Sequence, residues 1–235
     1  MNIALIPGRL GSKRLHRKQL RRLGGIPLFT RAIRKARNAG VFDEVWVSAS
    51  EDEFRTIAKQ EGVLFHRRPP ELSDGRYTCE DYILDFLKAH DCERLFEVQA
   101  TSPLLDTTDL IKFFYGVKSE AHYDTFLTVV QSTEEHAWSY PDERNQIAVP
   151  INFDFIRKHC SQHLRPVSRI TWGMSSWRRA VFLDAQVLPP VLGKAPTAGV
   201  FSGRIYLYPI SKLKGHTIQT QGDLEIAKHL LAVAA

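Results

Sequence analysis

Short apolar runs alternate with amphipathic helical stretches over the first 130 residues, and this alternation constrains the fold more than any other feature. Uninterrupted apolar runs predict strands buried on both faces, whereas apolar residues at every third or fourth position predict helices. The predicted strands are 2–6, 44–49, 63–66, 95–98, 125–130 and 203–208. The predicted helices are a first one between Pro27 and Gly40, then 52–61, 77–90, 107–117 and 223–234. This order predicts an α/β fold with a mainly parallel (mixed) sheet and helices on both faces.

The predicted fold sets where a ligand binds and how the chain is organised. Ligands of such sheets bind beyond the carboxyl ends of the strands, which is where the loop after residue 6 lies. We interpret residues 1–235 as a single domain. The alternation fades in the middle of the chain, where Trp and Arg residues gather, and we interpret about 135–185 as a projecting dimerisation arm or lid. The alternative is an ordinary surface insertion without a role in subunit contact or in covering the site.

The positive charge of the chain is concentrated at its start. The formal net charge is +6, yet eleven Lys and Arg residues and no acidic residue precede Asp43, while the remainder holds 21 basic and 26 acidic residues. A compact polyphosphate fits this distribution better than nucleic acid, which more often follows a long basic track. No stretch approaches the roughly 20 apolar residues that span a membrane, and three scattered cysteines do not suggest a disulfide framework. We expect a cytoplasmic protein that binds neither nucleic acid nor membrane.

The loop after the first predicted strand combines flexible backbone with positive charge. Gly8 and Gly11 allow close approach of a ligand, and backbone N–H groups at a strand-to-helix turn can face a phosphate. The polar side chains of the loop are Arg9, Ser12, Lys13, Arg14, Arg17 and Lys18. The loop matches neither the Walker pattern nor the dinucleotide G-x-G-x-x-G pattern. A solvated basic face is the alternative interpretation.

Residues 6–19 read IPGRLGSKRLHRKQ, which resembles the signature I-P-A-R-G-G-S-K-x-[IL]-P-x-K-N of the acylneuraminate cytidylyltransferases. Other segments resemble later landmarks of that family in the expected order: RPPEL at 68–72, QATSPL at 99–104, LPP at 188–190 and GRIY at 203–206. The resemblance covers nearly the whole chain and is weakest at 135–185. It implies a Rossmann-like nucleotide-diphosphosugar transferase fold and a homodimer.

The resemblance also implies the reaction. Such enzymes transfer CMP from CTP to the anomeric hydroxyl of a 2-keto acid sugar, a sialic-acid-like nonulosonate, and release pyrophosphate. Carried over by position, the catalytic residues are Arg9 and Lys18, and the sugar-binding residue is Gln99. The nucleotide-binding residues are Arg9, Ser12, Lys13, Lys18, Gln19, Arg68, Thr78 and Cys79. The alternatives are an ion pair for Arg68, a backbone contact for Gln99 and a small buried thiol for Cys79.

The chain departs from the family at residues 217–223, which read TIQTQGD where the family has D-I-D-T-x-x-D. Thr217 and Gln219 replace the two metal carboxylates, so the metal ligands are unknown, and Mg²⁺ would be held largely by the triphosphate and water. We interpret Asp223 as a helix cap. Three alternatives follow: an active enzyme with a differently held metal, an enzyme for an unusual acidic sugar, or a nucleotide-binding homologue with impaired catalysis.

Two further points concern the sugar. A carboxylate clamp is expected from an arginine, because a guanidinium binds a carboxylate through two hydrogen bonds. The candidates are Arg157, Arg165, Arg169, Arg178 and Arg179. A related class transfers CMP to eight-carbon keto-deoxy sugars and normally carries an aspartate in its fourth-strand motif, which Gln99–Ser102 lacks.

Overall fold

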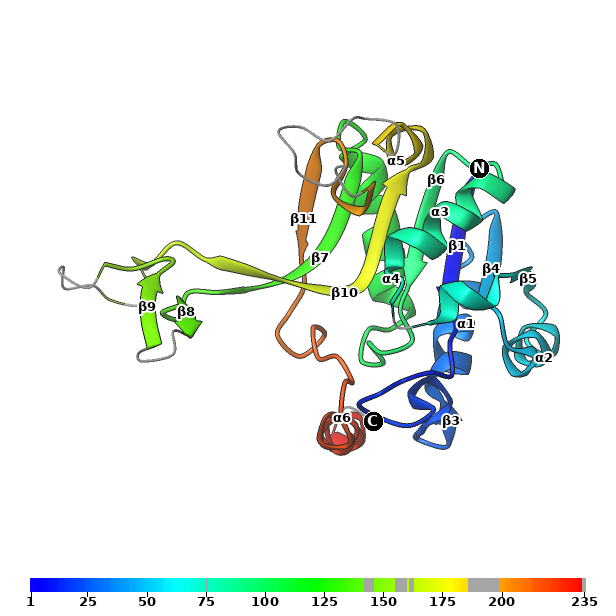
Figure 1. Ribbon diagram of the computed structural model, residues 1–235, viewed down its shortest axis with the longest axis horizontal. Coiled ribbons are helices and arrows are strands. Elements are labelled where there is room, and N and C mark those ends of the chain that lie inside the picture. Colours follow the sequence, from blue (N-terminus) through cyan, green and yellow to red (C-terminus); the bar gives the residue numbers. More distant parts are fainter. Residues whose placement is uncertain (75, 142–145, 155–159, 161–162, 186–198, 234–235) are drawn as a thin grey trace.

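A seven-stranded sheet forms the centre of the protein (Figure 1), in the order β11-β7-β10-β6-β1-β4-β5. The computed structural model describes residues 1–74, 76–141, 146–154, 160, 163–185 and 199–233. The strands of the sheet are β1 (Asn2–Pro7), β4 (Glu44–Ala49), β5 (Leu64–Arg67), β6 (Arg94–Val98), β7 (Thr125–Ser132), β10 (Val167–Arg178) and β11 (Ile205–Pro209). Neighbouring strands are parallel except at β10, which is antiparallel to both β6 and β7.

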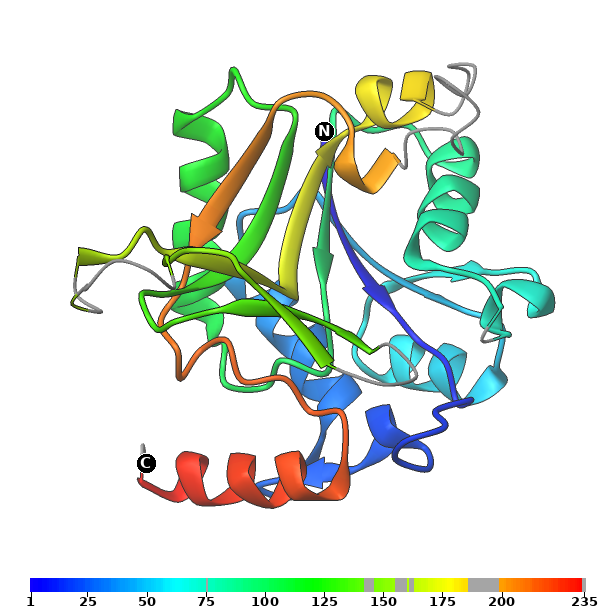
Figure 2. The same ribbon diagram turned by 60° about the vertical axis from the view of Figure 1, so that its left-hand side comes forward.

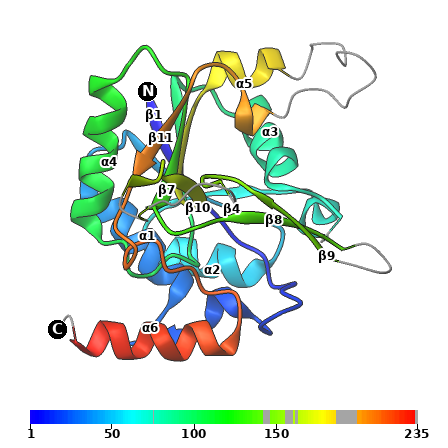
Figure 3. The ribbon, with the colours of Figure 1, turned by 90° about the vertical axis from the view of Figure 1, so that its left-hand side faces the viewer.

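Helices cover both faces of this sheet, and Figure 3 shows α4 and α3 on opposite sides. The helices are α1 (Leu28–Ala39), α2 (Asp52–Gln60), α3 (Cys79–Ala89), α4 (Thr107–Ser119), α5 (Arg179–Ala185) and α6 (Gln221–Val233). Alternate residues of β1 face different cores: Ala4 and Ile6 pack with α1, α2 and α4, whereas Ile3 and Leu5 pack with α3 and α5. An uninterrupted apolar run is therefore what this position requires. The predicted fold class is confirmed.

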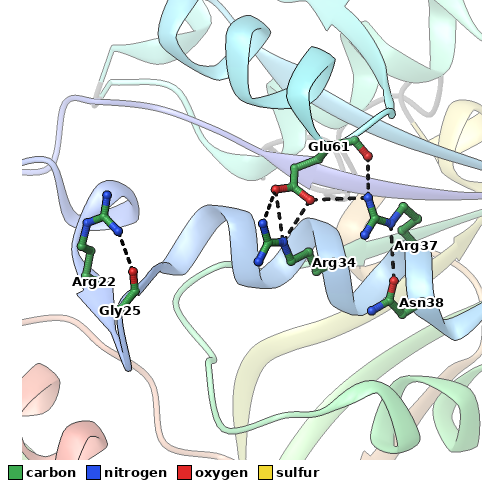
Figure 4. Close-up of polar contacts among 6 residues, drawn as sticks. All are labelled: Arg22, Gly25, Arg34, Arg37, Asn38 and Glu61. Carbon is green, nitrogen blue, oxygen red and sulfur yellow. Dashed lines mark hydrogen bonds and ion pairs between the residues drawn. The ribbon is translucent and has the colours of Figure 1, made fainter.

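Part of the positive charge at the start of the chain holds helices together instead of facing a ligand. The Glu61 carboxylate accepts hydrogen bonds of 2.8–3.1 Å from Arg34, and the Glu61 carbonyl accepts one of 2.8 Å from Arg37 (Figure 4). These contacts join α1 to the end of α2. Arg17 of the basic loop lies 3.4 Å from Glu53. Acidic residues from later in the chain thus neutralise part of the positive charge that precedes Asp43.

The stretch predicted as an arm or lid divides into two parts. A hairpin of β8 (Ala137–Pro141) and β9 (Gln146–Pro150) projects from the body on extended chain (Figure 1), whereas β10 and α5 belong to the main sheet and its covering layer. The sequence did not predict β10, whose polar and aromatic residues show no clear period. The role of the hairpin as a dimerisation arm or lid stays a prediction.

The last helix packs against the segment that follows β1 (Figure 2). Leu224 and Ala227 of α6 share a small apolar cluster with Leu15 and Leu23. That segment also contains η1 (Lys18–Leu20) and the short hairpin of β2 (Arg22–Leu23) and β3 (Ile26–Pro27).

Within the described residues, no helix has the length and apolar composition needed to cross a bilayer.

Candidate active site

The loop after β1 is held in shape by the side chain of Gln19. Its amide nitrogen donates to the Pro7 carbonyl at 2.9 Å, and its oxygen accepts from the Arg9 backbone N–H at 2.8 Å. A β-carbon on Gly8 would lie only 2.9–3.1 Å from the Phe54 ring, so this position requires glycine. Arg17 has a left-handed backbone (φ 48°) at the start of η1, where the chain turns into Lys18. The Gln19 side chain, the packing of Gly8 against Phe54 and the left-handed Arg17 therefore set the loop's path.

A cavity of about 300 Å³ opens between this loop, the segment after β5 and the end of β6. Most of its lining is polar or aromatic, which suits a nucleotide. The polar and aromatic side chains that line it belong to Arg9, Gln19, Arg68, Tyr77, Thr78, Tyr82 and Gln99, together with Cys79. We call it the first cavity.

A second cavity of about 250 Å³ adjoins the first, and both are lined by Arg9, Gln19 and Gln99. Its other lining residues are Ser12, Arg14, Lys18, Thr101, Thr171, Trp172, Thr217 and Gln219. Three cationic side chains therefore face a space whose described lining residues include no carboxylate. That electrostatic arrangement favours anionic ligands.

Eight of the nine site residues predicted from the sequence line one or both cavities. Lys13 does not: it lies in a separate hollow on another side of the loop, together with Gly11, His16 and Ser73. Ser12 borders both that hollow and the second cavity. Lys13 is therefore placed apart from the cation cluster that the loop presents to the two cavities.

Arg68 is almost completely buried, with 1% of its surface exposed. Its Nη2 donates to the Gly8 carbonyl and, at 3.1 Å, to the Ser73 hydroxyl, and its guanidinium lies 5.0 Å from the centre of the Tyr82 ring. Among the described carboxylates none forms an ion pair with Arg68. The Arg68 Nε has no hydrogen-bond partner among the described residues. Arg68 thus braces the loop after β1 and keeps one donor unused.

Thr78 and Cys79 bring the start of α3 to the first cavity. Thr78 and Asp81 form a capping box, in which the Thr78 backbone N–H donates to the Asp81 carboxylate at 2.6 Å. Burial raises the pKa of the Cys79 thiol to about 12, and the carboxylates of Glu97 and Glu80 add to that effect. The thiol is therefore protonated at neutral pH and is a poor nucleophile.

Lys18 reaches across the second cavity to residues from the end of the chain. Its ammonium group donates to the Gln219 side-chain oxygen at 3.2 Å. Burial lowers the pKa of Lys18, Arg14 and Arg9 lower it further, and the Asp223 carboxylate partly opposes them. An anion in the cavity would relieve this repulsion.

The side chains at 217–223 do not make a carboxylate site for a divalent cation. The Gln219 oxygen already accepts from Lys18, and the buried Thr217 hydroxyl has no partner among the described residues. One Asp223 oxygen accepts from the backbone N–H groups of Gln219 (3.0 Å) and Thr220 (2.7 Å), as a helix cap does. No cluster of three or more His, Cys, Asp or Glu side chains suited to a metal occurs in the described ranges. Neutral oxygen atoms beside an ammonium group do not fit a protein-held Mg²⁺.

The arginines proposed for the sugar carboxylate do not gather at these cavities. Arg178 pairs with Asp124 at 3.3 Å. It lies beside Arg94 at the start of β6, whereas the cavities lie at the other end of that strand. Arg179 donates to the Leu87 carbonyl. Arg169 donates to the Gly215 carbonyl, Arg165 borders a hollow near the projecting hairpin, and Arg157 lies outside the described residues. Arg14, a residue of the basic loop to which the family resemblance assigned no role, lines the second cavity.

Sequence reasoning also missed Tyr82, Glu97 and Trp172. Glu97 is buried behind Tyr82, and a charged residue inside the apolar run 95–98 was the available signal. Trp172 has a left-handed backbone (φ 57°), which is costly for a bulky residue, at the point where the pairing of β10 with β7 shifts register. Only the paired strands reveal that irregularity.

Comparison with known proteins identifies the family. A family model described as cytidylyltransferase matches residues 3–144. The chain belongs to the cytidylyltransferase family. The curated N-acylneuraminate cytidylyltransferase A of Danio rerio is 34% identical over 129 residues, which cover 54% of this chain and 30% of that protein. The resemblance to acylneuraminate cytidylyltransferases is thereby confirmed.

Two further cytidylyltransferases are similar to the chain. The pseudaminic acid cytidylyltransferase of Campylobacter jejuni is 28% identical over 159 residues, which cover 62% of this chain and 66% of that protein. A solved CMP:2-keto-3-deoxy-manno-octonic acid synthetase in complex with CTP has a TM-score of 0.72 at 16% identity and covers 100% of this chain and 99% of that one. The structural likeness supports the fold alone. The chain spans only about a third of the length of the curated N-acylneuraminate cytidylyltransferases of Danio rerio and Oncorhynchus mykiss that it matches.

Proposed function

We propose that this cytidylyltransferase transfers CMP from CTP to the anomeric hydroxyl of a sialic-acid-like 2-keto acid sugar and releases pyrophosphate. The observation that supports the proposal best is the pair of adjoining cavities with a shared wall of Arg9, Gln19 and Gln99. A nucleoside in the first cavity would extend its triphosphate toward the cations of the second, and an acidic sugar would approach the α-phosphate at the shared wall. Family membership and the names of the curated relatives support the same reaction.

The charges of the second cavity suit the chemistry of this transfer. The sugar oxygen attacks the α-phosphorus of CTP, the bond to the bridging oxygen of the β-phosphate breaks, and negative charge grows on the departing pyrophosphate. Arg9, Arg14 and Lys18 line the same space, where they can neutralise that charge in a partly buried setting. Arg68, whose buried Nε has no partner among the described residues, also lines the first cavity.

Magnesium, in this proposal, comes to the protein as a complex with the triphosphate. The lining side chains nearest Lys18 offer neutral oxygens, so phosphate oxygens and water supply the ligands of the metal. The alternative of a nucleotide-binding homologue without catalysis predicts CTP binding and no product.

The decisive experiment is an incubation with CTP, magnesium and a panel of nine-carbon 2-keto acid sugars. Release of pyrophosphate together with a CMP-sugar is expected for at least one sugar, and UTP or ATP in place of CTP should give much less product. An eight-carbon 2-keto-deoxy sugar tests the related substrate class. Calorimetric CTP binding without product for any sugar would overturn the proposed function and favour the non-catalytic alternative.

We also propose that the projecting hairpin supports a homodimer. Trp138 is 60% exposed at this hairpin, and Val149 and Ile151 are also exposed. Large apolar side chains on a projecting element are typical of subunit contacts. Analytical ultracentrifugation of the wild type and of Trp138→Ala tests this: a dimer that the substitution weakens is expected, and a monomeric wild type would contradict it.

A further inference from the structure

Glu97 is a buried carboxyl group behind the wall of the first cavity. It lies on β6, two residues before Gln99, and only 1% of its surface is exposed. Among the described residues no Lys or Arg forms an ion pair with it, and its Oε2 has no hydrogen-bond partner. A buried carboxyl group without an ionic partner is costly to fold around. The contacts of Glu97 with residues of the cavity wall offer a functional reason for a carboxyl group at this costly position.

A short chain of hydrogen bonds joins Glu97 to the cavity. The Tyr82 hydroxyl donates to Glu97 Oε1 at 2.5 Å, and Gln99 Nε2 donates to the Tyr82 hydroxyl at 3.3 Å. The Arg68 guanidinium over the Tyr82 ring holds the ring against the wall. Tyr82 lines the first cavity, whereas Gln99 belongs to the wall shared by both.

The polarity of this chain follows from the chemistry of its members. An ionised carboxylate only accepts hydrogen bonds, so the single hydroxyl proton of Tyr82 is directed at Glu97. The Tyr82 oxygen is then an acceptor, and Gln99 must present its NH₂ group to it. The oxygen and the nitrogen of a carboxamide point in different directions, so the Gln99 carbonyl oxygen is left for the cavities.

We propose that Glu97, acting through the Tyr82 hydroxyl, is a positioning residue that holds the Gln99 carbonyl oxygen toward the shared wall of the two cavities, where it accepts a hydrogen bond from a sugar hydroxyl. The sugar as ligand rests on the proposed function, whereas the orientation of Gln99 does not. This chain of hydrogen bonds from Glu97 through Tyr82 to Gln99, here called the relay, explains why a carboxyl group occupies this buried position of β6.

The relay responds to pH because Glu97 can take up a proton near neutrality. Burial raises the pKa of Glu97 to about 7, while the Tyr82 hydroxyl, the Gln99 amide and the Arg68 charge act in the opposite direction. A protonated Glu97 can donate to the Tyr82 oxygen. The Tyr82 proton is then free to meet the Gln99 carbonyl, and the amide reverses, so the cavities face an NH₂ group instead of an acceptor.

The other titratable groups near Glu97 keep their protonation state at pH values near neutrality. From α3, burial raises the pKa of Tyr82 well above its usual value and that of Cys79 to about 12. Arg68, whose pKa burial lowers, remains a guanidinium cation near neutrality. On the neighbouring strands, the residues in register are Ser175 of β10 and Leu5 of β1, and neither ionises.

The first test needs no substrate. In ¹⁵N-labelled protein, the side-chain NH₂ signals of Gln99, assigned by their loss in Gln99→Leu, should shift with a midpoint close to the Glu97 pKa. The shift should disappear in Glu97→Gln and remain in Glu93→Gln, which changes an exposed acid just before β6. Gln99 signals that do not respond to pH in the wild type, or that respond equally in Glu97→Gln, would overturn the proposal.

The second test is kinetic. Glu97→Gln and Tyr82→Phe should each raise the sugar KM about tenfold, roughly the effect of losing one hydrogen bond to a polar group. The CTP KM of Glu97→Gln, which changes a residue outside the cavity lining, should change less than about twofold. The double variant should be no worse than Tyr82→Phe, because Glu97 acts through Tyr82. The wild-type sugar KM should rise below neutrality, and that rise should vanish in Glu97→Gln.

The two tests separate this inference from the proposed function. A wild type that makes no CMP-sugar would remove the sugar role while the NMR titration still decides the orientation of Gln99. A turning-over wild type whose Glu97→Gln variant keeps the sugar KM and its pH profile would overturn the inference alone. If Glu97→Gln does not fold, Tyr82→Phe and the wild-type titration decide.

Discussion

The ammonium group of Lys18 lies 3.2 Å from the side-chain oxygen of Gln219, although the two residues are 201 positions apart. This contact closes the second cavity between the loop after β1 and the segment before α6. Lys18 is bound to a neutral partner, so its positive charge is not cancelled by a carboxylate there.

Replacing Lys18 by alanine should lower kcat/KM for CMP transfer at least tenfold, about 1.4 kcal/mol of transition-state stabilisation. The reason is the loss of one of the three cationic side chains that line the second cavity. Steady-state kinetics with pyrophosphate detection measure it. Lys59→Ala, which removes an exposed lysine of α2, is the matched control and should leave kcat/KM unchanged. Equal kinetics for both variants would remove Lys18 from the site.

CTP affinity should fall as the pH rises through the lowered pKa of Lys18. Burial first, then Arg14 and Arg9, lower this pKa from 10.5. A lysine with a lowered pKa is charged below that pKa and neutral above it, so the attraction to the triphosphate is present at neutral pH and is lost in the alkaline range. Calorimetric titrations between about pH 7 and 10 measure the change. Lys18→Arg should flatten it, and an identical decline in that variant would assign the titration to another group.

Gly8→Ala should destabilise the protein by roughly 1–3 kcal/mol and weaken CTP binding. The new β-carbon would lie 2.9–3.1 Å from the Phe54 ring, so either the ring or the loop must move. Urea denaturation measures the free energy of unfolding. Gly11→Ala is the matched control, because its β-carbon would meet the Ser73 carbonyl at an ordinary 3.9 Å. A Gly8→Ala protein as stable as Gly11→Ala would contradict the packing argument.

Asp223→Ala should cost about 1 kcal/mol of stability and raise the CTP KM. Asp223 caps α6 and also accepts from the Gln219 backbone N–H at 3.0 Å, so its loss frees both the helix end and the partner of Lys18. Burial acts to raise the pKa of Asp223, but hydrogen bonds from Thr220 and Gln219 hold it below its usual value. Thermal unfolding and kinetics measure the two effects. Asp223→Asn keeps one acceptor and should lose less, so a larger loss there would contradict the capping role.

Much of the sheet could be predicted because its signals are local. The strand at 44–49 has the predicted bounds, and the first helix ends at Ala39, before Gly40 as predicted, where Gly40 adopts a left-handed conformation. The capping role of Asp223 was also predicted and is confirmed by the hydrogen bonds that its carboxylate accepts. By contrast β10 was missed, because its place between β6 and β7 depends on partners about 40 to 80 residues away.

The amino-acid sequence by itself determined that a cationic, glycine-containing loop follows a buried first strand, because charge, backbone freedom and apolar runs belong to consecutive residues. Only the tertiary structure decided which of those charges face the cavities. Arg34 and Arg37 turn to Glu61, Lys13 borders another hollow, and Lys18 meets Gln219. The physical reason is that the direction of a long side chain depends on charges and surfaces that distant segments bring to it. No pattern of neighbouring residues records those contacts.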